Sequence, residues 1–490
     1  MLIRQTLLYL PAQLLGPLFQ FIAAVVWTHW LPPDAYGVLT FIIASQELAF
    51  AICLAWWSHY TMRYLGAFAD EAAKRRYQRS ENAVLLGAAL LQAAVAFGIL
   101  LALGQPATVS MLAVTVVFMV TRSATAHLIE RARARGQIAI YTVGQSIGPV
   151  IGFGLAWLVV SKVSATPEGA LAGFALAQAA GLAWLWRAMG LGLAVALPDR
   201  AILKRALAYG LPLIGAAVVG WISLNGIRVI VEHFRGVEAV GLISVGWGLG
   251  QRLASVVAML VTAAAFPLAV KRFQSGAKED GLKQLSDSGA LLLALLAPAS
   301  AGILMLTPEA VDLMIAEPFR AATIAVLPLA AIAGTVRNLR IHLGDQVFLL
   351  FEQTRLMILI NLVEAVAVVI LSSLGLYFQG YAGATAGCLA GSAIGALFGF
   401  ALARFKFGFR FPFAHAGRIL LATLCMALVL ALPQWPQLAP GELARMVLKV
   451  AAGAVVYAAA LAMLYPRFAT LGIDRLRLRI KRDRAEKPAH

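Results

Sequence analysis

The chain has 490 residues, of which 61% are hydrophobic and only 13% charged, and it carries a formal net charge of +17. A soluble domain is about 45–50% apolar and about 25% charged, so a soluble enzyme, a disordered protein and a disulfide-rich secreted scaffold are excluded. The apolar excess runs from one end of the chain to the other. It predicts an all-α polytopic membrane protein.

Several stretches without Lys, Arg, Asp or Glu are long enough to cross a bilayer, which takes about 20 residues per helix. They are 5–33, 82–121, 136–161, 169–186, 288–308, 365–403 and 419–441. The two longest read as helical hairpins, broken near Gly104 and near Gly380. We therefore predict about fourteen transmembrane helices, at 6–28, 37–58, 83–103, 107–128, 138–161, 169–186, 208–231, 239–266, 288–306, 321–340, 356–376, 380–403, 417–433 and 444–465.

The placement of Lys and Arg supports this segmentation, because cytoplasmic loops retain basic residues. Basic residues gather in alternate loops, such as 63–79, 131–135 and 200–205, whereas 30–36 and 376–380 contain none. This predicts a multi-pass membrane protein with both termini cytoplasmic. The basic tail 467–490 is expected to lie on anionic lipid.

Other functions find no support in the sequence. The positive charge is spread over alternate loops and fits topology and anionic lipid, so no nucleic-acid partner is expected. Cys53, Cys388 and Cys425 all fall inside predicted helices without metal-ligand spacing. We expect no metal, no cofactor and no enzymatic activity.

The sequence also contains a weak internal repeat. HWLPPDAYG at 29–37 corresponds to HFRGVEAVG at 233–241, and QELA at 46–49 corresponds to QRLA at 251–254. Six predicted helices separate the two copies, so both face the same way, as in parallel repeats.

Segments in and near the two copies of the repeat resemble a known family. LPPDAYG at 31–37, YGLPL at 209–213 and GVEAVG at 236–241 resemble the corresponding segments of polysaccharide biosynthesis flippases of the Wzx type. These belong to the multidrug/oligosaccharidyl-lipid/polysaccharide exporter superfamily. Many relatives carry an acidic residue about where this chain has Asn225, so any role of that acid is in doubt here.

The resemblance implies two six-helix bundles around a central cavity, 1–205 and 206–410, followed by two extra transmembrane helices in 411–466 and the basic tail. It implies that undecaprenyl-pyrophosphate-linked oligosaccharide is flipped for surface polysaccharide synthesis, with polymerase or glycosyltransferase partners. The alternative is a cation-coupled small-molecule exporter of the multidrug type in the same superfamily.

Charged residues within predicted helices are the candidate site, because such charges are expensive in the bilayer and usually face an interior or a water-filled cavity. Arg122, Arg228 and Arg252 are candidates for binding the substrate pyrophosphate, since Arg presents a fixed fork of donors that matches phosphate. Glu47 and Glu364 are candidates for carrying H⁺ or Na⁺, or for acting as counter-ions.

Each candidate has an alternative structural role. Arg252 could form a salt bridge to Glu47 or Glu364, while Arg122 and Arg228 could extend their side chains to a membrane surface.

Glycines recur every four residues in the predicted helix 380–403. They are Gly383, Gly387, Gly391, Gly395 and Gly399. Small residues at this spacing let membrane helices approach closely, so we predict a packing face, either static or sliding during transport.

Overall fold

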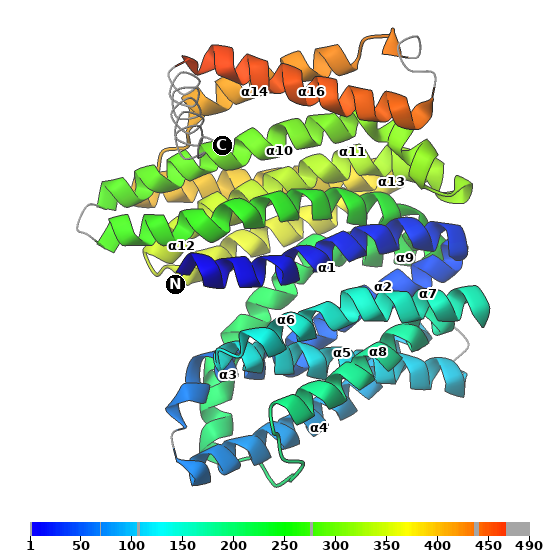
Figure 1. The fold of residues 1–490 in the computed structure, drawn as a ribbon, viewed down its shortest axis with the longest axis vertical. Coiled ribbons are helices and arrows are strands. Elements are labelled where there is room, and N and C mark those ends of the chain that lie inside the picture. The colour runs from blue at the N-terminus through cyan, green and yellow to red at the C-terminus, as the bar shows by residue number, and fades with distance from the viewer. Residues whose placement is uncertain (1, 69, 105–107, 275–277, 436–440, 467–490) are drawn as a thin grey trace, which may run out of the picture. The chain divides into compact units, whose positions relative to one another are not determined.

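The computed structural model describes residues 2–68, 70–104, 108–274, 278–435 and 441–466, and it describes side chains there except at 2–14, 260, 263 and 264. Every regular element in these ranges is a helix (Figure 1). The predicted interfacial tail, 467–490, lies outside the described residues.

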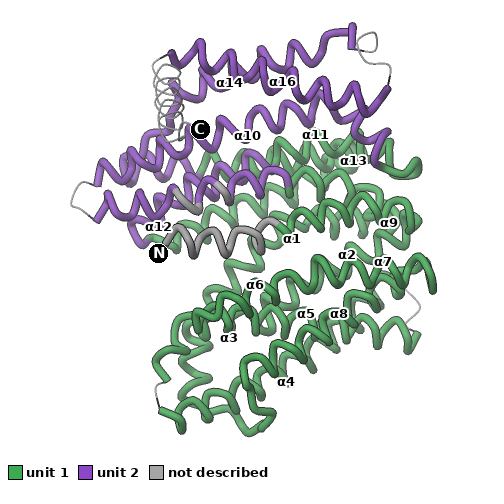
Figure 2. The backbone as a smooth tube through the Cα atoms, in the orientation of Figure 1, with its two compact units in different colours: residues 1–252, 315–333, 353–398 green, residues 253–314, 334–352, 399–490 purple. Residues whose placement is uncertain are grey.

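Contacts group the chain into two compact units (Figure 2). Unit 1 comprises residues 1–252, 315–333 and 353–398, and unit 2 comprises 253–314, 334–352 and 399–490. These units are not successive stretches of sequence. The division at 205, 410 and 466 is the one that the family resemblance implies, and it remains a proposal.

Helices α1 to α8 belong to unit 1, with most of α9 and α13. Their bounds, with short 3-10 (η2) and π-helical (η1, η3) turns, are α1 Leu2–Trp30, α2 Pro33–Phe50, η1 Ala51–Ala55, α3 Trp56–Tyr64, η2 Leu65–Ala67, α4 Glu71–Ala102, α5 Val109–Ala134, α6 Ile138–Ser146, η3 Ile147–Gly152, α7 Phe153–Lys162 and α8 Pro167–Ala188. Further along the chain follow α9 Arg200–Gln274, α11 Glu317–Leu339 and α13 Thr354–Phe407.

Unit 2 contains the remaining helices and the ends of α9, α11 and α13. Its own elements are α10 Lys278–Met314, the π-helical turn η4 Arg340–Gly344, α12 Asp345–Leu350, α14 Phe413–Leu430 and α16 Glu442–Leu464. Helices α10, α14 and α16 pack against one another. An ion pair between Lys449 and Glu309 joins α16 to α10, and Tyr457 donates a hydrogen bond to the Ala294 carbonyl at 2.6 Å.

Local sequence explains where several helices begin. The Asp70 side chain accepts a hydrogen bond from the Ala73 amide at 2.6 Å, and Thr108 accepts one from Met111 at 3.1 Å. At the start of α8, Thr166 accepts one from the Gly169 amide at 3.2 Å. Such N-cap side chains satisfy amides that the first turn leaves without a partner.

Eleven helical segments in the described residues are long and apolar enough to cross a membrane. Two of them, Arg200–Met259 and Thr354–Phe407, are each broken by one glycine with positive φ, Gly236 (81°) and Gly380 (63°). Each of these two segments is therefore a pair of helices, as the sequence predicts at 208–266 and 356–403. The total of fourteen remains a prediction.

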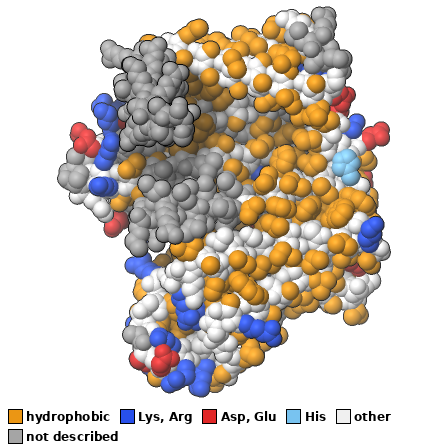
Figure 3. Space-filling model, in the orientation of Figure 1, with side chains coloured by type: hydrophobic (Ala, Val, Ile, Leu, Met, Phe, Trp, Pro, Cys, Tyr) orange, Lys and Arg blue, Asp and Glu red, His pale blue; other side chains and the backbone are white. Residues whose placement is uncertain are grey.

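The side chains agree with a membrane setting. Large apolar residues remain exposed along the helices, including Leu90 (67%) and Leu397 (71%). Figure 3 shows hydrophobic side chains over the bodies of the helices and Lys and Arg mainly near their ends. An apolar surface of this extent has no favourable contact with water. The protein is a multi-pass membrane protein.

Most helices are longer than the predicted spans. The predicted helix 83–103 lies inside Glu71–Ala102, apart from its last residue, and 288–306 lies inside Lys278–Met314. Hydropathy marks only the part of a helix that crosses the apolar layer. The helical hydrogen bonds continue beyond it into charged turns, such as the first turn of α4, where Lys74 pairs with Glu71 at 2.8 Å. The apolar pattern therefore places a span correctly and underestimates the helix.

The glycine series lies in the second half of α13 and faces the first half of the same helix. A Cβ added to Gly387 would lie 2.2 Å from the Leu371 carbonyl oxygen, and one added to Gly391 would lie 2.6 Å from the Val368 amide nitrogen. Gly383 makes an equally close approach to Gly375. The turn at Gly380 thus closes a hairpin whose two backbones touch.

The two copies of the internal repeat meet in unit 1. A Cβ on Gly37 would lie 2.0 Å from the Val237 carbonyl oxygen, and a Cβ on Gly241 would lie 1.8 Å from the Pro33 carbonyl oxygen. The contact is reciprocal, since each glycine receives the backbone of the other copy. We call this contact the glycine clasp.

Candidate functional site

Three predicted arginines and one predicted glutamate come together in unit 1. Arg122 lies on α5 and Glu47 on α2, and their side chains form an ion pair with Nη2 and Oε1 3.8 Å apart. Neither side chain is fully covered by the protein, with 32% of Arg122 and 48% of Glu47 exposed. Arg228 and Arg252, both on α9, lie within electrostatic range of the same carboxylate.

Arg228 is held by neutral polar groups. Its Nε donates to the Ser244 hydroxyl at 3.2 Å, and its Nη1 donates to Asn225 Oδ1. Ser244 is bonded in turn to the Thr40 hydroxyl at 3.3 Å, which connects α9 to α2. Asn225 therefore supplies an acceptor to Arg228 without neutralising it, whereas an acid at this position would.

Arg252 reaches across to α1, where its Nη1 donates to the backbone carbonyl of Gln20 at 2.8 Å. It also lies within electrostatic range of Arg122 and of the Tyr36 phenol. Tyr36 is buried and packs edge-to-face on Phe319, with ring centroids 5.7 Å apart.

We call Arg122, Arg228, Arg252, Glu47 and Tyr36 the arginine cluster. Three guanidinium groups and one carboxylate give it a net positive charge. Guanidinium stays ionised at any relevant pH and presents paired donors to phosphate oxygens. The arrangement suits a ligand that carries more than one negative charge.

Glu364 has a different setting from the cluster. It lies in the hairpin interface of α13, fully buried, where its Oε1 accepts a hydrogen bond from Ser392 at 3.1 Å. A Cβ on Gly395 would lie 2.7 Å from the Glu364 Cβ. The absence of a side chain at Gly395 thus leaves room for the Glu364 side chain between the two halves of the hairpin. Gly399 follows in sequence on the same helix.

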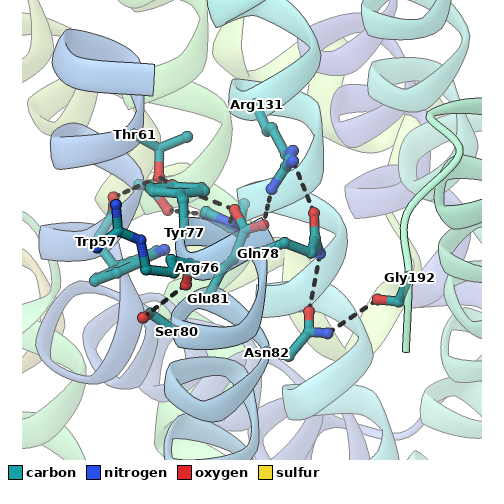
Figure 4. A network of polar contacts seen from close by, with 12 residues as sticks. Trp57, Thr61, Arg76, Tyr77, Gln78, Ser80, Glu81, Asn82, Arg131 and Gly192 are labelled. Carbon is teal, nitrogen blue, oxygen red and sulfur yellow. Dashed lines mark hydrogen bonds and ion pairs between the residues drawn. The ribbon is translucent and has the colours of Figure 1, made fainter. Parts of the chain in front are cut away.

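The structure also contains a charged cluster that the sequence did not reveal (Figure 4). Glu81 on α4 and Arg131 on α5 form an ion pair, and the Glu81 Oε1 lies 2.9 Å from the His127 Nε2. The other ring nitrogen of His127 lies 2.9 Å from the Ser58 hydroxyl of α3. Glu81, His127 and Arg131 are 0%, 0% and 2% exposed.

Further hydrogen bonds extend this network. Arg131 Nη2 donates to Gln78 Oε1 at 2.9 Å, and Gln78 donates to Asn82 Oδ1 at 3.0 Å. Asn82 donates to the carbonyls of Gly192 and Ala194, each at 2.9 Å.

The network is sealed by aromatic rings. The Tyr77 ring stacks on Trp57, with centroids 5.6 Å apart, and it lies 5.6 Å from the Arg131 guanidinium carbon. We call Glu81, His127, Arg131 and Tyr77 the sealed network.

These residues escape prediction because each stands where a charge is expected in the sequence. Glu81 directly precedes the stretch 82–121, and Arg131 belongs to a cluster of loop arginines. The signal that could have found them is a spacing of four. Tyr77 and Glu81 share one face of α4, and His127 and Arg131 share one face of α5.

No metal site is evident in the described ranges, where no group of three or more His, Cys, Asp or Glu side chains is arranged to hold a metal ion.

The fold is shared with transporters of known structure. The lipid II flippase MurJ in an inward closed conformation superimposes with a TM-score of 0.72 at 13% identity, covering 95% of this chain and 100% of that one. An inward-facing multidrug resistance MATE family transporter of the MOP superfamily gives 0.63 at 16%, covering 81% and 98%. A mutant form of a Vibrio cholerae MATE transporter gives 0.53 at 16%, covering 83% and 96%.

No protein-family model matches the sequence, and no curated protein matches it either. The chain shares the polytopic helical fold of these solved structures. At these identities the likeness concerns the fold alone.

Proposed function

We propose that the protein is a flippase that moves polyprenyl-pyrophosphate-linked oligosaccharide across the bacterial inner membrane for surface polysaccharide synthesis. Undecaprenyl is the expected lipid, and exopolysaccharide, capsule and O-antigen are the candidate products. A polymerase and glycosyltransferases would be its partners, and both termini would be cytoplasmic. The fold shared with a lipid II flippase and the resemblance in segments 31–37 and 209–241 support this proposal.

The observation that carries it is the composition of the arginine cluster. A pyrophosphate carries at least two negative charges and must enter a region where charge is poorly solvated. Arg122 and Arg252 are partly exposed, and one carboxylate, Glu47, lies within electrostatic range of all three guanidinium groups. The excess positive charge is therefore available to an anionic headgroup.

The two glutamates are proposed to have separate roles. Glu47 would act as counter-ion to the arginines when no substrate is bound. When substrate binds, its phosphate groups would replace Glu47 as the partner of the arginines. Glu364, buried beside Ser392, is the better candidate for carrying H⁺ or Na⁺, because a desolvated carboxylate gains most from binding a cation.

The second candidate is a cation-coupled multidrug-type exporter, which the MATE neighbours support. An organic cation would be repelled by the arginine cluster. Expression in a drug-sensitive strain distinguishes the two functions: the flippase proposal expects no change in resistance to cationic dyes.

The test is surface polysaccharide in a flippase-null strain, normalised to the amount of membrane-inserted protein. Arg252→Ala should reduce export about 10- to 100-fold, which corresponds to the loss of one or two hydrogen bonds to a charged group. Arg252→Lys should recover part of the export, because a point charge cannot bind bidentately. Arg355→Ala, an exposed cation at the start of α13, is the control and should export normally.

Two outcomes would contradict the assignment. Full export by Arg252→Ala would remove Arg252 from the substrate site. Restored export in the double variant Arg252→Ala, Glu47→Gln would show that Arg252 serves only to neutralise Glu47.

A further inference from the structure

A second basic site lies beside the sealed network, where α4 begins and α5 ends. It is a pocket of about 360 Å³ whose wall includes Lys74, Arg131 and Arg135 together with Leu65, Phe68 and Tyr77. It is separate from the arginine cluster in residues, and the flippase proposal makes no use of it.

The charges around this pocket are unbalanced. None of the described residues that line it is acidic. Arg131 is paired with Glu81 behind the wall, and Lys74 is paired with the exposed Glu71. Arg135 has no ion pair among the described residues and lies close enough to Arg131 for the two cations to repel each other.

Arg131 provides a second observation. Its side chain is 2% exposed, yet its Nε has no hydrogen-bond partner in the described part of the chain. A buried donor without a partner is costly. An anion bound against this wall would offset the repulsion between Arg131 and Arg135.

The position of the pocket indicates where such an anion would come from. Leu65 lies at the end of the candidate span Pro33–Ala67, Lys74 lies in the first turn of Glu71–Ala102, and Ala134 ends Val109–Ala134. Lining residues from three candidate spans thus come together where these helices end, and helix ends are where a membrane protein meets lipid headgroups.

We propose that this pocket binds the phosphate of an anionic phospholipid. Lys74 and Arg135 would contact phosphate oxygens, as basic pockets between transmembrane helices do. Leu65 and Phe68 would contact the glycerol and the upper acyl chain. Free inorganic phosphate offers the same oxygens to Lys74 and Arg135, but it has no apolar part to contact Leu65 and Phe68.

The experiment measures lipid binding to the purified full-length protein by native mass spectrometry. Phosphatidylglycerol is the probe, phosphatidylcholine the uncharged comparison, and millimolar inorganic phosphate the competitor. The test variant is Lys74→Gln, Arg135→Gln. The matched control is Arg75→Gln, Arg133→Gln, which removes two exposed cations from the same helix ends outside the pocket.

We expect phosphatidylglycerol to bind more tightly than phosphatidylcholine. The test variant should bind it about 100-fold more weakly, which corresponds to two lost charge-assisted hydrogen bonds, and the control should stay within about twofold of the wild type. Arg135→Lys should retain most of the binding, which separates a lost contact from a lost fold.

Three results would overturn the proposal. An equal loss in the control would reduce the effect to general surface charge. Unchanged binding in the test variant would exclude the pocket. Displacement of the lipid by inorganic phosphate would make a soluble anion the ligand.

Discussion

The arginine cluster and the sealed network place charges inside the helices of unit 1 in opposite ways. In the sealed network one acid meets one guanidinium, both are buried, and neutral polar side chains surround them. In the arginine cluster three guanidinium groups share one carboxylate, and the Arg122 and Glu47 side chains remain partly exposed. Balanced and buried charge holds helices together, whereas unbalanced and accessible charge is available to a ligand. This difference can be tested by substitution.

The largest expected effect is on the sealed network. Arg131→Ala would leave Glu81 buried without its ion-pair partner, which costs about 3–5 kcal/mol. Thermal unfolding of the purified protein should show a strong loss of stability. Arg133→Ala removes a cation from the more exposed pair with Glu130, 3.6 Å apart, and should cost less than about 1 kcal/mol.

A double variant sharpens this result. Glu81→Gln with Arg131→Gln removes both charges and keeps a hydrogen-bonding group at each position, so it should regain much of the lost stability. Equal melting temperatures for Arg131→Ala and Arg133→Ala would show that the network is not a structural element.

A smaller effect is expected at Glu364, which is buried like Glu81 but lies in the α13 hairpin. Ser392→Ala removes the hydroxyl that donates to Glu364 at 3.1 Å and should cost about 1–3 kcal/mol. Ser161→Ala is the control, because that hydroxyl is bonded to its own helix, at the Leu158 carbonyl. A loss at Ser161 as large as that at Ser392 would contradict the assignment.

The smallest expected effect is in the arginine cluster itself. A double-mutant cycle on Arg122 and Glu47 should give a coupling energy of about 0.2–1 kcal/mol, because their ion pair is long and partly exposed. The coupling should weaken in high salt. A coupling of several kcal/mol would place this pair with the sealed network and remove the contrast between the two regions.

The sequence predicted the fold class, the break near Gly380, a connection between predicted helices 208–231 and 239–266, and the positions of most spans, because bilayer crossing imposes a strong apolar pattern. It also singled out Arg122, Arg228 and Arg252, since a charge within an apolar stretch is conspicuous.

The partners of these residues could not be predicted. Tyr36, Ser244 and the Gln20 carbonyl come from other helices or other turns, and only packing brings them to the arginines. The sealed network was missed for a related reason: Glu81 stands just before an apolar stretch and Arg131 stands among loop arginines, where a charge is ordinary in sequence, yet the helices run on and bury them.

The glycine clasp has a mechanical consequence. Gly37 and Gly241 bring two backbones together with no side chain between them, so this junction has no rotamers with which to absorb movement. The two backbones can therefore either stay in contact or separate together at both glycines. A single methyl group at either position would push the two backbones apart. Because the contact is reciprocal, both duplicated segments would be displaced.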